Sequence, residues 1–131
     1  MEILNVLVAA AAGFALGAVY YGILAEPWMV AAGIRRGTDG KPESGQTALT
    51  FAIGFVLQLV VAGMMRHVFT LSGISSAGAG FVAGLGVGLF FITPWIALNN
   101  LYAGRPVKLT VIDGGYATLA CAVIGLVLSL F

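Results

Sequence analysis

The chain has 131 residues, of which 60% are hydrophobic and only 8% are charged. Its mean hydropathy of +1.06 lies well outside the range of a soluble domain and excludes that class. The net charge of +1 gives no reason to expect nucleic acid as a partner.

Four apolar stretches are each long enough to cross a membrane: residues 3–25, 47–67, 77–98 and 109–131. About 20 helical residues, at ~1.5 Å each, cover a hydrocarbon core of about 30 Å. Helices are expected because backbone groups in lipid must pair within their own segment, and no stretch alternates as a barrel strand does. The connectors leave no room for a soluble domain. The sequence therefore predicts an all-α membrane protein with one domain, residues 1–131, folded as a four-transmembrane-helix bundle.

The first stretch begins with Glu2 and no Lys or Arg, so we expect it to stay attached rather than to be cleaved as a secretory signal. Pro27 interrupts helical hydrogen bonding, and Trp28 favours the headgroup layer. From Trp28 to Arg36 a short helix lying in the interface is one option. Contact with lipid headgroups is predicted for four side chains: Trp28, Arg35, Arg36 and Trp95.

Small residues recur at every fourth position in three of the spans. They are Ala9, Gly13 and Gly17 in the first span, Gly80, Gly84 and Gly88 in the third, and Ala117, Cys121 and Gly125 in the fourth. Such stripes let helix backbones approach closely, which drives packing in lipid where water exclusion does not. We expect most of this helix packing inside the bundle and reserve one stripe for an oligomer or a partner. A lone Cys121 in such a stripe is a small packing residue.

Two short motifs of the sequence occur twice, at the same spacing. GFALG at 13–17 is followed by PW at 27–28, and GFVAG at 80–84 is followed by PW at 94–95, at the same offset. This favours two parallel helical hairpins related by an axis along the membrane normal. The second and fourth spans match poorly, so shared packing chemistry without duplication is the alternative.

Positive charge is distributed unevenly among the connectors. Arg35, Arg36 and Lys41 lie in the first connector and Arg105 and Lys108 in the third, whereas only Arg66 lies near the second. With four spans the first and third connectors share one side, which the positive-inside rule makes cytoplasmic. Both termini are then predicted to be periplasmic.

The candidate polar site comprises Gln58, Asn99, Asn100, Arg105, Lys108, Asp113 and Tyr116. Gln58 lies near the centre of the second span, where its amide either joins two helices or lines a pore or pocket. Asp113 is expected at the interface, paired with Lys108 or Arg105 or capping a helix end, with a site role left open. The two asparagines are expected to bond the last carbonyls of the third span.

Residues that carry catalysis are not recognisable in the sequence. No histidine pair, phosphate-binding loop or nucleophile with a base is visible, and His67 stands alone beside Arg66 at the predicted outer end of the second span. The sequence therefore predicts no enzyme activity, no cofactor and no metal.

Two segments, GAVYYGILAEPWM at 17–29 and NLYAGRPVKLTVIDGGY at 100–116, resemble the signatures of a small bacterial integral-membrane family known as domain of unknown function 1761. The resemblance implies four spans in the bacterial inner membrane and brings no molecular function. One departure is YYGI at 20–23, where the family often has Trp-Tyr-Ser-Pro, so a proline kink is missing here.

Three functional hypotheses follow. The first is a non-enzymatic protein that acts by association in the bilayer, as a homo-oligomer or an accessory subunit of a larger membrane complex, because of its small-residue stripes. The second is a small channel or transporter for ions or small neutral solutes, using Gln58 and the polar layer. The third is headgroup binding by Arg35, Arg36, Arg105 and Lys108.

Overall fold

The computed structural model describes residues 2–43 and 46–131. The first span is α1 (Glu2–Ile23), which the short α2 (Ala25–Ala32) follows, and the second span is α3 (Ala48–Ser72). The third span is continuous through α4 (Ala77–Gly86), the π-helix η1 (Val87–Ile92) and α5 (Thr93–Tyr102), and the fourth is α6 (Val107–Leu128). Within the described residues, four segments are long and apolar enough to cross a membrane. The predicted all-α four-span bundle is confirmed.

Capping residues lie at both ends of α3. The hydroxyl of Thr47 accepts a hydrogen bond from the backbone N–H of Thr50 at 3.2 Å and starts α3. Gly73, with φ of 70°, ends α3, so this helix continues past the predicted limit at His67. The expected interfacial helix at 28–36 lies earlier, as α2, and Arg36 instead forms an isolated bridge with Pro42.

The third span widens into a π-helix just before Pro94. A proline has no N–H to donate, and its ring collides with the carbonyl four residues before it, here that of Phe90. The wider turns of η1 accommodate this proline without ending the helix. The carbonyl oxygen of Gly88 accepts the backbone N–H of Thr93 and also its hydroxyl, the latter at 2.7 Å.

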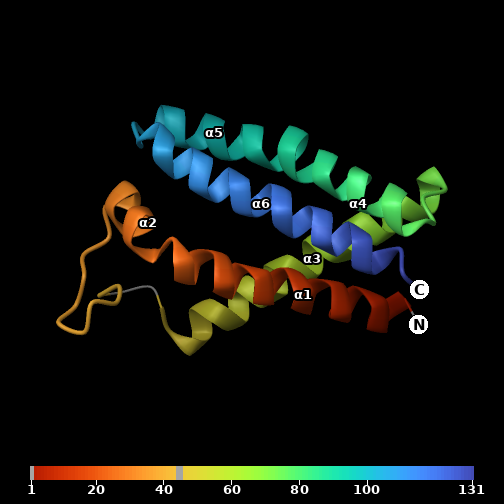
Figure 1. Ribbon diagram of the computed structural model, residues 1–131, viewed down its shortest axis with the longest axis horizontal. Helices are drawn as coiled ribbons and strands as arrows, with labels where there is room; N and C mark the ends of the chain where they lie inside the picture. The colour runs from red at the N-terminus through yellow and green to blue at the C-terminus, as the bar shows by residue number, and fades with distance from the viewer. Residues whose placement is uncertain (1, 44–45) are drawn as a thin grey trace.

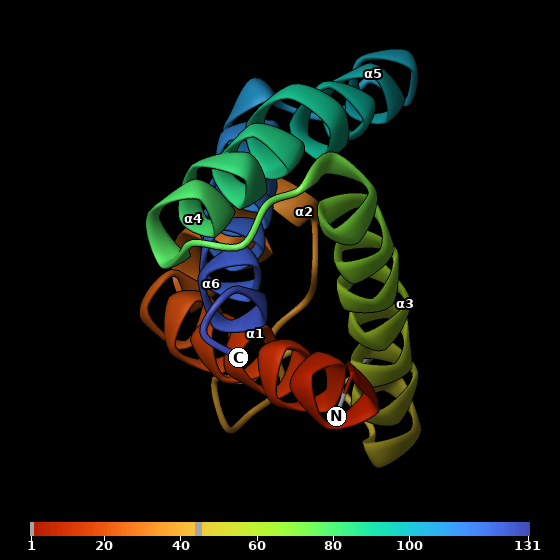
Figure 2. The same ribbon diagram turned by 90° about the vertical axis from the view of Figure 1, so that its right-hand side faces the viewer.

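The helix α6 lies at the centre of the arrangement, with α1 on one side and α4 to α5 on the other (Figures 1 and 2). Both described ends of the chain lie at one end of the bundle. The described connector residues, 33–43, 46–47 and 103–106, lie at the other, which we call the connector end (Figure 1). Because α1 and α4 to α5 run in one direction and α3 and α6 in the other, the chain forms two parallel hairpins. The helix α3 packs mainly against α1 and less against α6.

The glycines of the third span lie directly against the backbone of α6. A β-carbon at Gly84 would overlap the carbonyl of Cys121, and one at Gly80 would overlap the carbonyl of Gly125. A β-carbon at Gly88 would lie 2.5 Å from the carbonyl oxygen of Ala117. Two helices can approach this closely only where side chains are missing.

The equivalent glycines of α1 face side chains and not the backbone of another helix. Gly13 faces the side-chain oxygen of Gln58, and Gly17 faces the hydroxyl of Tyr116, each of which would lie 2.7 Å from an added β-carbon. Backbone therefore packs on backbone in the second hairpin, whereas in α1 the glycines make room for polar side chains. The two repeated motifs therefore have different neighbours.

A core of small and branched side chains fills the half of the bundle near the termini: Ala9, Ala10, Ala62, Met65, Phe69, Cys121, Ile124 and Leu128. Large apolar side chains elsewhere face outward, and Leu57 and Val60 on α3 are 60% and 64% exposed. In water such a surface would be an aggregation liability, but in a bilayer it is the ordinary lipid-facing surface.

Candidate functional site

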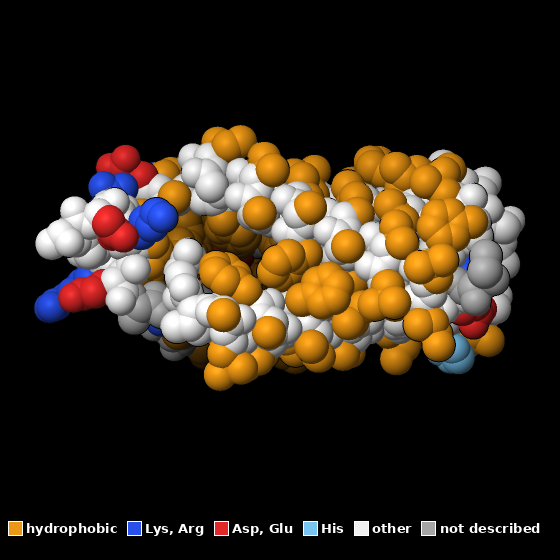
Figure 3. Space-filling view, turned by 90° about the horizontal axis from the view of Figure 1, so that it is seen from below, with side chains coloured by type: hydrophobic (Ala, Val, Ile, Leu, Met, Phe, Trp, Pro, Cys, Tyr) orange, Lys and Arg blue, Asp and Glu red, His pale blue; other side chains and the backbone are white. Residues whose placement is uncertain are grey.

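A cavity of about 940 Å³ lies between α1, α3 and α6 in the half of the bundle near the connector end. Small residues form part of its walls, among them Ala18, Gly22, Gly54 and Ala120. Figure 3 shows a hollow on the face formed by α1 and α3, bordered by apolar side chains, with charged side chains gathered at the connector end. Because the opening lies on the side of the bundle, a bilayer would surround it.

The cavity wall is mainly apolar and carries a few polar groups. These are Lys41, Gln46, Gln58 and Asp113, with the phenols of Tyr21 and Tyr116. Cys121 and Ile124 belong both to the cavity lining and to the core cluster. The cavity therefore extends from the connector end to the middle of the bundle, where the core closes it.

Two hydrogen-bonded groups hold the polar side chains in place. Tyr21 donates its hydroxyl to the Oδ1 atom of Asp113 at 2.7 Å, joining α1 to α6. The amide of Gln58 donates to the hydroxyl of Tyr116, which itself donates to the carbonyl oxygen of Gly13 at 2.7 Å. Gln58 thus links α3 to α6 and also lines the cavity, so both of the roles weighed from the sequence apply. Such bonds are needed because lipid provides no water to polar groups.

Aromatic rings surround the Asp113 carboxylate. The ring of Tyr21 meets that of Tyr116 at 5.2 Å between centroids and that of Trp28 at 5.9 Å, both edge to face. The three rings come from α1, α6 and α2, and all three residues line the cavity together with Asp113. The site therefore combines one carboxylate with three aromatic rings in an apolar wall.

The expected ion pair of Asp113 with Lys108 or Arg105 is wrong. The two ion pairs of the described residues join Arg36 to Glu26 and Arg66 to Glu2. Arg105 instead donates to the carbonyl oxygen of Ala32 at 3.1 Å, at the end of α2. The sequence places Arg105, Lys108 and Asp113 at one depth of the membrane. In the structure α1 lies against α6 at that depth, so Tyr21, and not a cationic side chain, bonds the Asp113 carboxylate.

The other predicted polar and headgroup residues lie outside the cavity wall. Asn100 donates to the hydroxyl of Thr110 at 3.0 Å and not to a helix-terminal carbonyl as expected. Trp95 is 64% exposed on the outer surface. Exposed side chains at the connector end are Arg35, Arg36, Asn99, Arg105 and Lys108. Of the predicted headgroup residues, Trp28 is the one that the structure places in the cavity wall.

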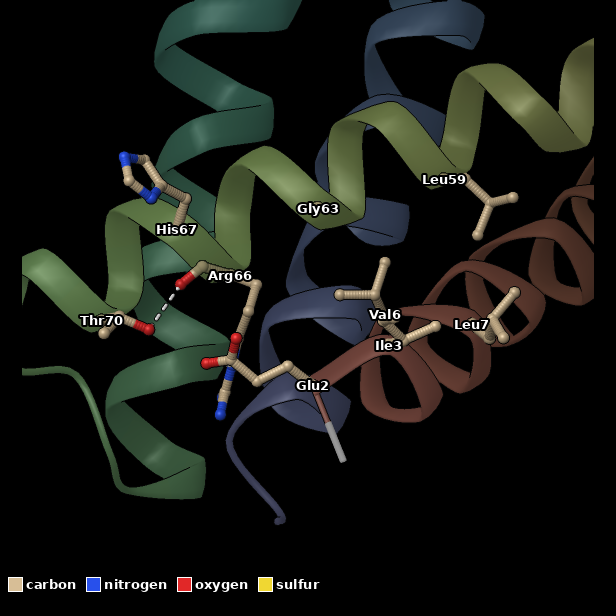
Figure 4. Close-up of a pocket in the computed structure, with 9 residues that line it drawn as sticks. All are labelled: Glu2, Ile3, Val6, Leu7, Leu59, Gly63, Arg66, His67 and Thr70. Carbon is tan, nitrogen blue, oxygen red and sulfur yellow. Dashed lines mark hydrogen bonds and ion pairs between the residues drawn. The ribbon is translucent and has the colours of Figure 1, made fainter.

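A second, smaller hollow of about 500 Å³ lies between α1 and α3 near the termini (Figure 4). Its apolar part includes Ile3, Val6 and Leu59, while Glu2 lies beside Arg66, and His67 points away (Figure 4). Arg66 donates to the carbonyl oxygen of Leu128 at 2.9 Å, so it satisfies the last turn of α6 in addition to pairing with Glu2.

Asn5 is a buried polar residue that the sequence analysis missed. It is 1% exposed, and its amide donates to the carbonyl oxygens of Leu128 at 3.1 Å and Phe131 at 2.6 Å. A lone amide in the first turns of an apolar span was the available signal, because in lipid it needs a partner. In residues 2–43 and 46–131, no group of three or more His, Cys, Asp or Glu side chains is arranged to hold a metal ion.

The model of one protein family, described as a protein of unknown function (DUF1761), matches residues 4–129, almost the whole chain. The chain belongs to this family. Comparisons with curated proteins and with solved structures found no match. The DUF1761 match covers all four spans, so the cavity lies wholly within the family's domain.

Proposed function

We propose that the chain is a non-enzymatic, multi-pass protein of the bacterial inner membrane that holds a lipid-soluble molecule in the cavity between α1, α3 and α6. The observation that supports this proposal is a cavity of about 940 Å³ with apolar walls and few polar groups, open on the side of the bundle. Small-molecule sites typically measure about 300–1,000 Å³ and have this composition. A molecule dissolved in the bilayer reaches such an opening without crossing water.

Association with other subunits receives less support from the geometry. The glycines Gly80, Gly84 and Gly88 lie against α6 of the same chain and are not available to a neighbour. Assembly through other faces stays a prediction, which native mass spectrometry from mild detergent would test. A channel or transporter would need a path through the core around Phe69, and flux into liposomes would reveal one.

The binding proposal predicts quenching of Trp28 by a brominated ligand. In a Trp95→Phe variant, Trp28 is the single tryptophan, and it lines the cavity. We expect 12-bromododecanol, a neutral lipid-soluble probe, to quench its fluorescence saturably in mild detergent, because bromine quenches on contact. Filling the cavity with Ala18→Phe should remove the saturable part.

The matched control is Trp28→Phe, which leaves Trp95 on the outer surface, where it is 64% exposed. Quenching of Trp95 should rise with the probe concentration in the detergent without saturating. Equal, non-saturating quenching of both tryptophans would remove the proposal.

The proposed orientation has its own test. Five of the six Lys and Arg residues lie in or beside the first and third connectors, so that end is assigned to the cytoplasm. Alkaline phosphatase fused after Phe131 should be active in cells, and green fluorescent protein fused there should stay dark. Fluorescence from the second fusion would reverse the orientation without affecting the cavity.

A further inference from the structure

We propose that the molecule bound in the cavity is a lipophilic cation, whose charged centre lies between the Asp113 carboxylate and the rings of Tyr21, Tyr116 and Trp28. This inference rests on the proposed function and names the chemical class of its ligand. It follows from the charge of the site and from the arrangement of its rings.

Asp113 has no cationic partner among the ion pairs of the described residues. Its Oδ1 atom accepts the hydroxyl hydrogen of Tyr21 at 2.7 Å, and neither ion pair of the described chain includes it. A carboxylate held in a spanning helix is costly unless it is paired, because the bilayer has a low dielectric constant. A cation in the cavity would supply the missing charge and gain a strong electrostatic interaction in return.

The aromatic rings favour a cation with apolar substituents. Tyr21, Tyr116 and Trp28 form a continuous group with centroid distances of 5.2 and 5.9 Å. Ring faces attract cations, most strongly where water is excluded. A quaternary ammonium or a phosphonium keeps its charge inside an apolar shell, so it suits both the rings and the apolar wall.

Lys41 provides the competing interpretation. It comes from the connector between α2 and α3, and it is the cationic side chain of the cavity lining. A ligand with an acidic head would bind Lys41 and avoid Asp113. Two probes of nearly the same size and shape but opposite charge, tetraphenylphosphonium and tetraphenylborate, distinguish the two alternatives.

Equilibrium dialysis of each probe against the purified protein tests the proposal. Tetraphenylphosphonium should bind saturably, and Asp113→Asn should weaken it about tenfold, because the charge is lost while Asn can still accept from Tyr21. Glu43→Gln removes a carboxylate outside the cavity at the same end and should change nothing. Trp28→Leu should weaken binding several-fold, whereas Trp28→Phe, which keeps a ring, should retain most of it.

Equal affinity of wild type and Asp113→Asn for tetraphenylphosphonium would overturn the inference. Saturable binding of tetraphenylborate that Lys41→Gln removes would also overturn it. Quenching by 12-bromododecanol separates the two levels of the proposal, because this neutral probe needs the cavity but not the charge. If it quenches Trp28 saturably while the cation shows no dependence on Asp113, the cavity function stands and the cation assignment fails.

Discussion

Replacing Gly84 by alanine is expected to lower the free energy of unfolding by about 2–3 kcal/mol. The added β-carbon would overlap the carbonyl of Cys121 and approach the Cα atom of Ala122 at 3.1 Å. Both neighbours are backbone atoms of a helix, which cannot move aside as the end of a side chain can. The two helices must therefore separate, and their dispersion contacts weaken along the whole seam. Unfolding by sodium dodecyl sulfate in mixed micelles would measure the loss.

The same helix supplies the control. Gly86 has no atom within 4 Å of an added β-carbon, so Gly86→Ala tests the effect of alanine in α4 without a collision. It should leave stability unchanged or raise it by up to about 1 kcal/mol, the difference in helix propensity. Equal losses at the two positions would mean that α4 does not pack on α6 through this face.

The four spans follow from the sequence because hydropathy is a local property. A run of about 20 apolar residues must be helical in lipid whatever its neighbours are. The helix ends were less predictable: α3 continues to Ser72, where Gly73 provides the left-handed cap, whereas the predicted span ended at His67. The periodic glycines likewise predict close packing but do not state which helix is the partner.

The cavity could not be predicted, because it depends on how helices lean. Asp113 and Tyr21 are 92 residues apart in sequence, and their contact exists because α1 lies along α6. The cavity next to this contact lies between α1, α3 and α6, so its walls come from segments far apart in the chain. The sequence analysis named Gln58, Asp113 and Tyr116 as polar candidates, and the structure places all three in the lining. It missed Tyr21, since a tyrosine near a span end is ordinarily assigned to the headgroup layer.

The polar groups of the bundle form two layers with different tasks. Near the connector end, Asp113 and Gln58 line the cavity. Near the termini, Asn5 and Arg66 are directed at the last carbonyls of α6. The first layer suits binding, because its residues line the cavity. The second stabilises the fold, because its groups are used within the chain.

Replacing Asn5 by leucine is therefore expected to destabilise the protein by about 1–3 kcal/mol, although leucine is the more apolar residue. The amide of Asn5 donates hydrogen bonds to the carbonyl oxygens of Leu128 and Phe131, and the side chain is buried. Asn5→Asp, which keeps the size but loses both donors, should cost at least as much. Asn99→Leu, at an exposed asparagine, should stay within about 0.5 kcal/mol of wild type.

A double variant tests whether Asn5 and Arg66 act on the same group, because Arg66 is the second donor to the carbonyl oxygen of Leu128, at 2.9 Å. In Asn5→Leu that oxygen keeps one partner, and in Arg66→Leu it keeps the other. In the double variant it has neither, so the combined loss should exceed the sum of the single losses by about 1 kcal/mol. Hydrogen exchange in the last turn of α6 should rise in the same order. Strict additivity would mean that the two side chains do not share this carbonyl, and that the end of α6 is held in another way.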